Sequence, residues 1–486
     1  MSANAAQRFS TRWQAAVASG ANDVQREIFT FAKIKLLGLL DADDPCLSSE
    51  QKSTKPDGEL AALGTRLMLE FEPLRESADQ EARLVEGHMR IAYSVPKHRH
   101  YLRGGTPSEP VLAEAAACIM DNMSHTLLAT LEGYLKIGLI SKGERGELVS
   151  RLLLTLAHDK CVTFDPDKAH EAQFSKPIPV VHFLEALVGR RHMEAILDSK
   201  LNNVDNNITF REAFKDAKLN FTHFVRGGDA SVITDKAAWM ALSRCMAFQC
   251  ANGQWMIDLY IPILLWDEKL SRYVVSGIFI QIKNRLKKQP VEIDATKLGF
   301  FSDSPDGNPH SVRYNERPYI TIVMHLGIQP GSPDVIIASA PVRQQPVRRV
   351  KKTDKNIHPR YAINITGCEN AVYDVIKKED DHKYAALLTS RDVLGEHPRQ
   401  GDNFIRAVLR LKPYWTELAR SFHWATTDED EHEHEHEHER EPFVVGLSID
   451  PPLKPLEDTK GKGRDFMEDK TDDFNKDQDS DSMDVA

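Results

Sequence analysis

The chain has 486 residues, of which 41% are hydrophobic, and a formal net charge of −10. This size can bury one large core or two, because single domains usually hold about 100 to 200 residues. No apolar run approaches the roughly 18 to 20 residues that span a bilayer, and residues 1–8 lack the apolar core of a signal peptide. The six scattered cysteines lack the spacings of zinc sites or disulfide frameworks. We therefore expect an intracellular protein, cytoplasmic or nuclear, and no contact with a membrane.

The negative charge is concentrated at one end of the chain. Residues 428–486 hold 21 acidic and 7 basic side chains, a net charge of −14, so residues 1–427 carry +4. Such a mildly basic body is compatible with nucleic acid as a partner but does not require it, since dedicated DNA-binding modules are usually far more basic.

The first half of the chain is predicted to be mostly helical. Residues 1–58 form a poorly defined segment, and residues 59–230 carry apolar residues at helical spacing, as Leu148, Leu152 and Leu156 do. The expected helices are Glu59–Glu72, Ala113–Met120, Leu127–Leu135, Glu144–His158, Val180–Leu197 and Phe210–Phe224. We interpret residues 59–230 as a helical domain that could bind a protein partner.

The periodicity changes after residue 230. A helix over Asp235–Arg244, capped by Thr234, is followed by alternating segments that predict strands, with an Asn252-Gly253 turn after the first. The predicted strands are Cys245–Cys250, Gln254–Leu265, Arg272–Lys283, Tyr319–Ile328, Asp334–Ala340 and Tyr361–Thr366, and the predicted helices beyond them are Ala371–Leu388 and Asn403–Arg420. Residues 231–425 are thus expected to form a mixed α and β domain, which makes the chain an α+β protein.

Past Thr427 the sequence becomes low in complexity. Glutamate and histidine alternate over residues 431–439, and an acidic tail follows a proline-interrupted segment. This composition cannot bury enough apolar surface to offset chain entropy. We expect residues 426–486 to be disordered, apart from an apolar island at Phe443–Leu447 that could dock as a strand. The repeat histidines could gather a metal ion weakly or serve no specific purpose.

Three polar residues on neighbouring predicted strands could form a hydrolytic site. Asp258 lies in an otherwise apolar run, where a lone carboxylate is costly to bury without a cation or hydrogen-bond partner. In an extended strand Gln281 and Lys283 point to one face, while the isoleucines between them point to the other. Phosphodiester hydrolysis needs a carboxylate for Mg²⁺, a second oxygen ligand and a cation near the attacking water. An alternative is a structural ion pair between Asp258 and Lys283.

Two basic clusters could contact phosphates. Arg285, Lys287 and Lys288 continue directly from Lys283, and we take them as candidate nucleic-acid contacts. The second cluster, which could also be a nuclear import signal, comprises Arg343, Arg348, Arg349, Lys351, Lys352 and Lys355. Solvated loops are the alternative interpretation for both. Phosphate-binding Gly-rich loops and the serine-hydrolase elbow are absent from the sequence.

Six blocks of the sequence carry a resemblance to known proteins: Gly138–Val149, Leu152–Asp159, Phe210–Asp216, Asn220–Phe224, Met246–Leu265 and Gly277–Asn284. They resemble a large multicopy family of uncharacterised proteins from mushroom-forming fungi, with a likeness that spans about residues 60–425. Within them, Asp258 and Gln281-x-Lys283 are similar to the PD-(D/E)xK nuclease superfamily, especially its Gln-x-Lys variants such as Mrr-like restriction enzymes. The helix Asp235–Arg244 lacks the internal Glu often seen on the first helix of that superfamily.

The second resemblance implies a restriction-endonuclease-like mixed sheet flanked by helices. It also implies that Asp258 and Gln281 ligate Mg²⁺ and that Lys283 orients the nucleophilic water. The expected function is a Mg²⁺-dependent nuclease or a catalytically decayed relative of one. The alternative is a non-catalytic scaffold for protein interactions. A nuclease needs the three side chains to converge in an open cleft, whereas a scaffold tolerates them buried, paired or apart.

Overall fold

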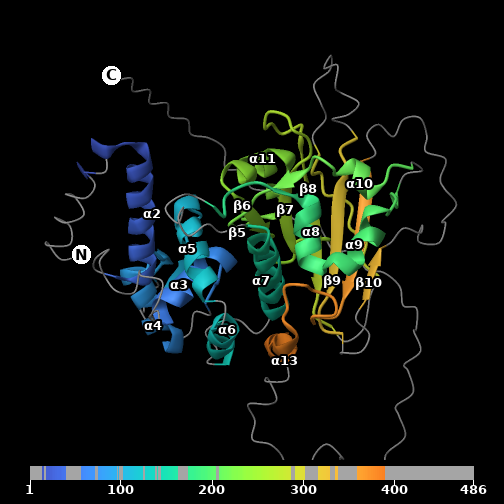
Figure 1. Cartoon of the computed structure of the whole chain (residues 1–486). Coiled ribbons are helices and arrows are strands. Elements are labelled where there is room, and N and C mark those ends of the chain that lie inside the picture. The colour runs from blue at the N-terminus through green and yellow to red at the C-terminus, as the bar shows by residue number, and fades with distance from the viewer. Residues whose placement is uncertain are drawn as a thin grey trace, which may run out of the picture. The chain divides into compact units, whose positions relative to one another are not determined.

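The structure is a computed structural model of the whole chain (Figure 1). It describes residues 14–15, 18–39, 56–71, 75–95, 97, 102–123, 126–136, 140, 144–162, 173–203, 207–285, 290–301, 316–328, 334–337 and 358–388. These residues lie in one compact unit, Met1–Glu396. The predicted helix Asn403–Arg420, the apolar island Phe443–Leu447 and the acidic tail lie outside the described residues. No helix among those described is long and apolar enough to cross a membrane.

A mixed sheet forms the centre of this unit. Its strands in the described chain are β3 (Ile178–Pro179), β4 (Lys218–Leu219), β5 (His223–Arg226), β6 (Met246–Gln249), β7 (Leu259–Leu264), β8 (Val275–Lys283), β9 (Tyr319–His325), β10 (Asp334–Ile337) and β11 (Arg360–Thr366). The hydrogen-bonded order is β10-β11-β9-β8-β7-β4-β3. β7 is antiparallel to β8, whereas β8, β9 and β11 run parallel to one another. The predicted α+β class is confirmed.

The sheet divides along β7. The first part of this strand pairs with β6, through Leu259 and Tyr260, and its last part pairs with β4, through Ile263 and Leu264. β6 in turn pairs with β5 in parallel. The end of β6, the start of β7 and the end of β8 therefore lie at the same edge of the sheet.

Helices share a single large hydrophobic core with one face of the sheet; some of them contact the strands and others pack on those helices. They are α2 (Ala21–Leu37), α3 (Pro56–Leu67), α5 (Pro110–Asn122), α6 (Leu127–Lys136), α7 (Arg145–Lys160), α8 (Val180–Val188), α9 (Arg190–Leu197) and α13 (Asp381–Leu388), and Figure 1 shows α2 to α5 gathered on one side. Ile278, Ile280 and Ile282 of β8 enter this core together with Leu152 of α7. The predicted alternation of β8 is confirmed.

The opposite face of the sheet packs against α11 (Asp235–Ser243), the helix that the sequence predicted over Asp235–Arg244. Phe279 and Tyr260 belong to this second core, which also takes in Ala238 of α11. Thr234 caps the helix by accepting a hydrogen bond from the backbone N–H of Ala237. The large first core includes residues on both sides of residue 230, the expected boundary between the helical and α/β domains.

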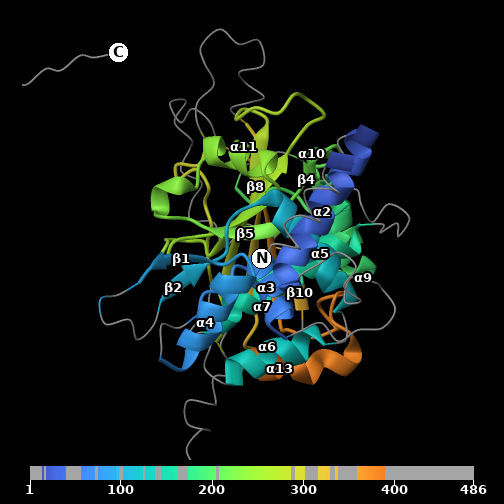
Figure 2. The same ribbon diagram turned by 90° about the vertical axis from the view of Figure 1, so that its left-hand side faces the viewer.

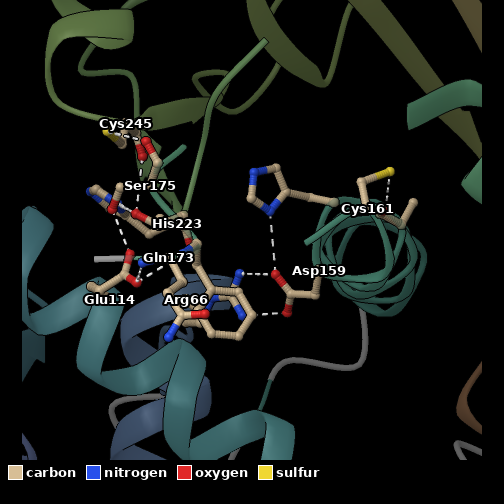
Figure 3. A network of polar contacts seen from close by, with 12 residues as sticks. Arg66, Glu114, Asp159, Cys161, Gln173, Ser175, His223 and Cys245 are labelled. Carbon is tan, nitrogen blue, oxygen red and sulfur yellow. Dashed lines mark hydrogen bonds and ion pairs between the residues drawn. The ribbon is translucent and has the colours of Figure 1, made fainter. Parts of the chain in front are cut away.

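A polar network attaches the helices to the sheet (Figure 3). Arg66 of α3 is fully buried and makes a bidentate ion pair with Asp159 near the end of α7, at 2.5 and 2.8 Å. Its Nε also donates to the backbone oxygen of Thr222, just before β5. Glu114 of α5 accepts hydrogen bonds from the backbone N–H groups of Gln173 and Phe174. Charged groups thus link α3 to α7 and to the segment just before β5, and link α5 to Gln173 and Phe174.

Two predicted helices are wrong in part. Phe210–Phe224 holds only a short helix, α10 (Phe210–Ala213), followed by β4 and β5, because pairing with β7 and β6 overrides the helical spacing of the apolar residues. Val180–Leu197 is divided into α8 and α9 at Gly189, whose φ of 80° interrupts the helix.

Three further predictions were right in type but too long. β7 begins at Leu259 rather than at Gln254, and Ala371–Leu388 contains turns, a short 3₁₀ helix (Lys378–Asp380) and α13. α3 ends at Leu67 rather than at Glu72.

A small hairpin stands beside this unit's main sheet. β1 (Ile91–Ser94) pairs with β2 (Arg103–Gly105) in antiparallel register, next to α4 (Arg75–Gly87) (Figure 2). Beneath it, Arg90 makes an ion pair with Glu81 of α4 at 2.8 Å, and both side chains are buried. Arg90 also donates to the backbone oxygens of Leu69 and Gly104. The hairpin is therefore fixed to α4 and to the segment that follows α3.

Candidate functional site

Asp258 and Gln281 meet at the edge of the sheet where β7 begins. Asp258 directly precedes β7, and Gln281 belongs to β8, whose Ile280 pairs with Leu259. The Nε2 of Gln281 donates to Oδ2 of Asp258 at 2.5 Å, and the backbone N–H of Ile282 donates to the same oxygen at 2.6 Å. The two residues that the sequence proposed as metal ligands are therefore in direct contact.

Lys283, the third residue of the predicted site, acts on Asp258 through its positive charge. It lies two residues beyond Gln281 on β8 and is half-buried. Both Asp258 and Lys283 are described, and the structure places no ion pair between them; the carboxylate bonds to Gln281 and Ile282 instead. Burial raises the pKa of Asp258, and it outweighs the opposing effects of the Ile282 hydrogen bond, the Lys283 charge and the Gln281 hydrogen bond.

Asp258 lines a surface depression together with two further carboxylates. The depression has a volume of about 350 Å³ and is lined by Asp258, Glu144, Glu147 and the turn Cys250–Gly253. This turn joins β6 to β7, and Gly253 takes a φ of 75° in it, as the Asn-Gly signal predicts. The carboxylate of Asp258 thus reaches solvent beside two acids from another part of the chain.

Glu144 and Glu147 come from the start of α7, and the sequence analysis missed both as site residues. Burial raises the pKa of each carboxyl; the charge of Glu70 adds to this at Glu144, and that of Asp258 adds to it at Glu147. Gln249 at the end of β6 donates to Glu147 at 2.7 Å. Their three-residue spacing at a helix start was visible in the sequence, but the proximity of α7 to Asp258 depends on tertiary packing.

Two arginines lie behind these carboxylates. Arg151, one turn along α7, is buried and lies 3.8 Å from Glu147, while its Nε and Nη1 have no hydrogen-bond partner. Burial lowers its pKa. Arg226 at the end of β5 pairs with Glu70 and approaches Glu144 to 4.0 Å. Positive charge therefore borders the acidic depression from within the protein.

A second, larger depression adjoins the first. Its volume is about 680 Å³, and the two share Ala251 and Asn252 in their linings. It extends over Arg226 and Gly227-Gly228 towards Tyr93 of the hairpin. The shared residues make the two hollows neighbours on one surface.

Other predicted contacts are only partly described. Arg285 is exposed just beyond β8, whereas Lys287, Lys288, the second basic cluster and the Glu-His repeat lie outside the described residues. Within the described part of the chain, no group of three or more His, Cys, Asp or Glu side chains could hold a metal ion.

A comparison with protein families matches residues 49–298 to the model of a family described as "Domain of unknown function (DUF8736)". This match covers α3 to α11, the strands β1 to β8, and the residues of both depressions. Neither the curated proteins nor the solved structures contain a match to the chain.

Proposed function

The chain belongs to the DUF8736 family, and we propose that it is a Mg²⁺-dependent nuclease whose site is the depression at Asp258. One observation carries the proposal. Asp258 and Gln281, from adjacent strand segments, are hydrogen-bonded to each other, and Asp258 lines an open hollow together with Glu147 from α7. The chemistry of the side chains, their shared opening and the charge of Lys283 support a site for phosphodiester hydrolysis.

The donor set suits Mg²⁺. This ion is usually held by one or two carboxylates, with water and substrate phosphate completing its octahedron, so a cage of three protein ligands is not needed. Asp258 and Glu147 are such carboxylates. Burial raises the pKa of both and outweighs the charges of Lys283 and Arg151 and the hydrogen bonds that favour the ionised forms. A bound cation would stabilise those forms further, and Mg²⁺ would supply charge stabilisation at the phosphate.

The neighbouring side chains take supporting roles. Gln281 fixes one oxygen of Asp258 and leaves the other for a ligand. Lys283 adds positive charge on the same face of β8, where it would orient the attacking water. Gln249 holds the carboxylate of Glu147 at the mouth of the hollow.

Cleavage assays on the full chain test the proposal. Single- and double-stranded DNA and RNA are incubated with Mg²⁺ or Mn²⁺, and products are resolved by length. We expect cleavage that requires the cation and that falls at least 100-fold in Asp258→Asn and in Glu147→Gln, because each removes a charged ligand.

Asp267→Asn is the matched control. Asp267 follows the same strand and is 88% exposed on its side chain. Cleavage should persist in this variant, and circular dichroism should show that all three variants are folded. Wild-type activity in folded Asp258→Asn, or no cleavage of any of the four substrates with either cation, would overturn the proposal.

A non-catalytic interaction protein is the second candidate. The hydrogen bond between Gln281 and Asp258 favours it, because the pair satisfies much of its own polarity without a ligand. On this alternative the site would be structural, and the wild type and Asp258→Asn alike would leave every cleavage assay at background while a partner still bound the full chain.

A further inference from the structure

Tyr93 is an exposed aromatic residue held in a fixed position on the β1–β2 hairpin. Its side chain lines the larger depression, and 66% of its surface is exposed. The ring lies against Gly105 on β2, where an added Cβ would come within 2.5–2.9 Å of three ring and hydroxyl atoms. Glycine at this position thus lets the ring lie on the backbone, with its remaining surface open to the depression.

The hairpin that carries Tyr93 is rigidly anchored. The buried Arg90–Glu81 pair lies beneath β2, and an added Cβ at Gly104 would meet Oε1 of Glu81 at 2.1 Å. The hairpin therefore cannot move away from α4 without breaking a buried ion pair. An aromatic ring on such a support loses little conformational entropy when it binds a ligand.

The rest of the lining combines apolar residues with polar groups and one ion pair. Met68, Leu69 and Phe224 are apolar, Ser108 and Asn252 are polar, and the charges of Glu70 and Arg226 are paired with each other. Such a lining suits a planar, mostly neutral ring that carries hydrogen-bonding edges.

Ser108 is arranged as a hydrogen-bond acceptor. The Thr222 hydroxyl donates to the backbone oxygen of Cys245, so it accepts from Nδ1–H of His223. Burial lowers the pKa of His223 to about 3, so the ring is neutral and its Nε2 accepts from the Ser108 hydroxyl at 3.0 Å. The lone pairs of Ser108 are then left for a donor on the ligand, such as the exocyclic amine of a base.

We propose that the larger depression is a nucleobase subsite for single-stranded nucleic acid, with Tyr93 as the stacking platform. This inference rests on the proposed nuclease function, because the shared Ala251 and Asn252 would place the sugar-phosphate of the bound nucleotide near Asp258. We specify a single strand because a base in a duplex is already stacked on both faces and paired along its Watson–Crick edge.

Binding can be measured without cleavage. Full-length Asp258→Asn is titrated into fluorescent 12-nucleotide single-stranded DNA and RNA, and into the matching duplexes, with fluorescence anisotropy as the readout. We expect tighter binding to the single strands. Stacking of one base predicts that adding Tyr93→Ala weakens this binding about 5- to 100-fold and that Tyr93→Phe largely preserves it.

Trp239→Ala is the matched control, because Trp239 is a partly exposed aromatic residue on α11 that lines neither depression. It should leave binding unchanged. Equal affinity for duplexes, no binding of single strands, or unchanged binding in folded Tyr93→Ala would overturn the subsite. These binding results are independent of the cleavage assay. Cleavage by the wild type together with binding that does not depend on Tyr93 would contradict only the subsite. Binding that depends on Tyr93 without cleavage by the wild type would contradict only the nuclease function.

Discussion

The two ends of α7 carry carboxylates in opposite electrostatic states. Near its C-terminal end, the pKa of Asp159 is lowered: burial acts to raise it, but the charge of Arg66 and the hydrogen bond from His158 overcome that effect. At its N-terminal end, burial raises the pKa of Glu144 and Glu147. The helix dipole favours the reverse order, because it stabilises anions at the N-terminus.

This contrast distinguishes a structural ion pair from a candidate site. Asp159 has a bidentate partner inside the protein, so its charge helps to hold α3 against α7. Glu147 lies beside Asp258, and the nearest guanidinium, that of Arg151, is 3.8 Å away. A carboxylate whose charge the fold compensates only in part, beside an opening, marks a candidate place for a ligand.

The largest expected effect concerns the C-terminal end. Arg66→Met should destabilise the protein by about 3–5 kcal/mol, because it leaves Asp159 without its buried partner. Urea denaturation followed by circular dichroism measures the change. Arg211→Met, which breaks an exposed pair with Glu194, is the control and should change stability by about 0–1 kcal/mol. A loss below about 1 kcal/mol in Arg66→Met would show that the network is not structural.

A bound Mg²⁺ should stabilise the protein only through the carboxylates at and beside the N-terminal end of α7. Mg²⁺ at a hundredfold excess over its Kd should stabilise the wild type by about 2.7 kcal/mol through mass action, and this should raise Tm. The gain should disappear in Asp258→Asn and persist in Asp159→Asn, compared at equal ionic strength by thermal denaturation. An equal gain in both variants would place the cation elsewhere.

Asp→Asn should change the free energy of unfolding in opposite directions at Asp159 and at Asp258. At pH 7 without Mg²⁺, Asp159→Asn should lower the free energy of unfolding by about 1.5–3 kcal/mol, because it weakens charged hydrogen bonds to Arg66. Asp258→Asn should gain about 1 kcal/mol, because it removes a buried charge while its amide oxygen still accepts from Gln281 and Ile282.

The pH dependence of these two variants follows from the pKa directions. The wild type loses the stabilisation from Asp159 as the pH falls from the ordinary Asp pKa of 3.8 through the lowered pKa of the folded state, so the deficit of Asp159→Asn should shrink there. The penalty at Asp258 appears as the pH rises from 3.8 through its raised folded pKa, so the advantage of Asp258→Asn should grow over that range. Urea melts from pH 3 to pH 8 measure both, and parallel profiles would contradict the contrast.

Local chemistry was enough to predict much of the fold and part of the site. The alternation of Ile278, Ile280 and Ile282 set which face of β8 is buried, and the Asn252-Gly253 pair set the turn between β6 and β7. Because Asp258 was predicted on a strand next to the one that carries Gln281, these two signals also predicted that the two side chains lie close together. Both signals depend only on neighbours along the chain or on the pairing of two strands, and the two-residue alternation strongly specifies the register of that pairing.

Tertiary structure decided the rest. The apolar spacing over Phe210–Phe224 is compatible with a helix, but distant β6 and β7 recruit this segment as β4 and β5. Glu147, Ser108 and Tyr93 come to the surface near Asp258 from three separate segments. The sequence by itself determined the pattern of most elements and the Asp258–Gln281 contact. Only the packed structure determined which distant acids and aromatic groups surround it, because that depends on helix docking and on contacts far apart in the chain.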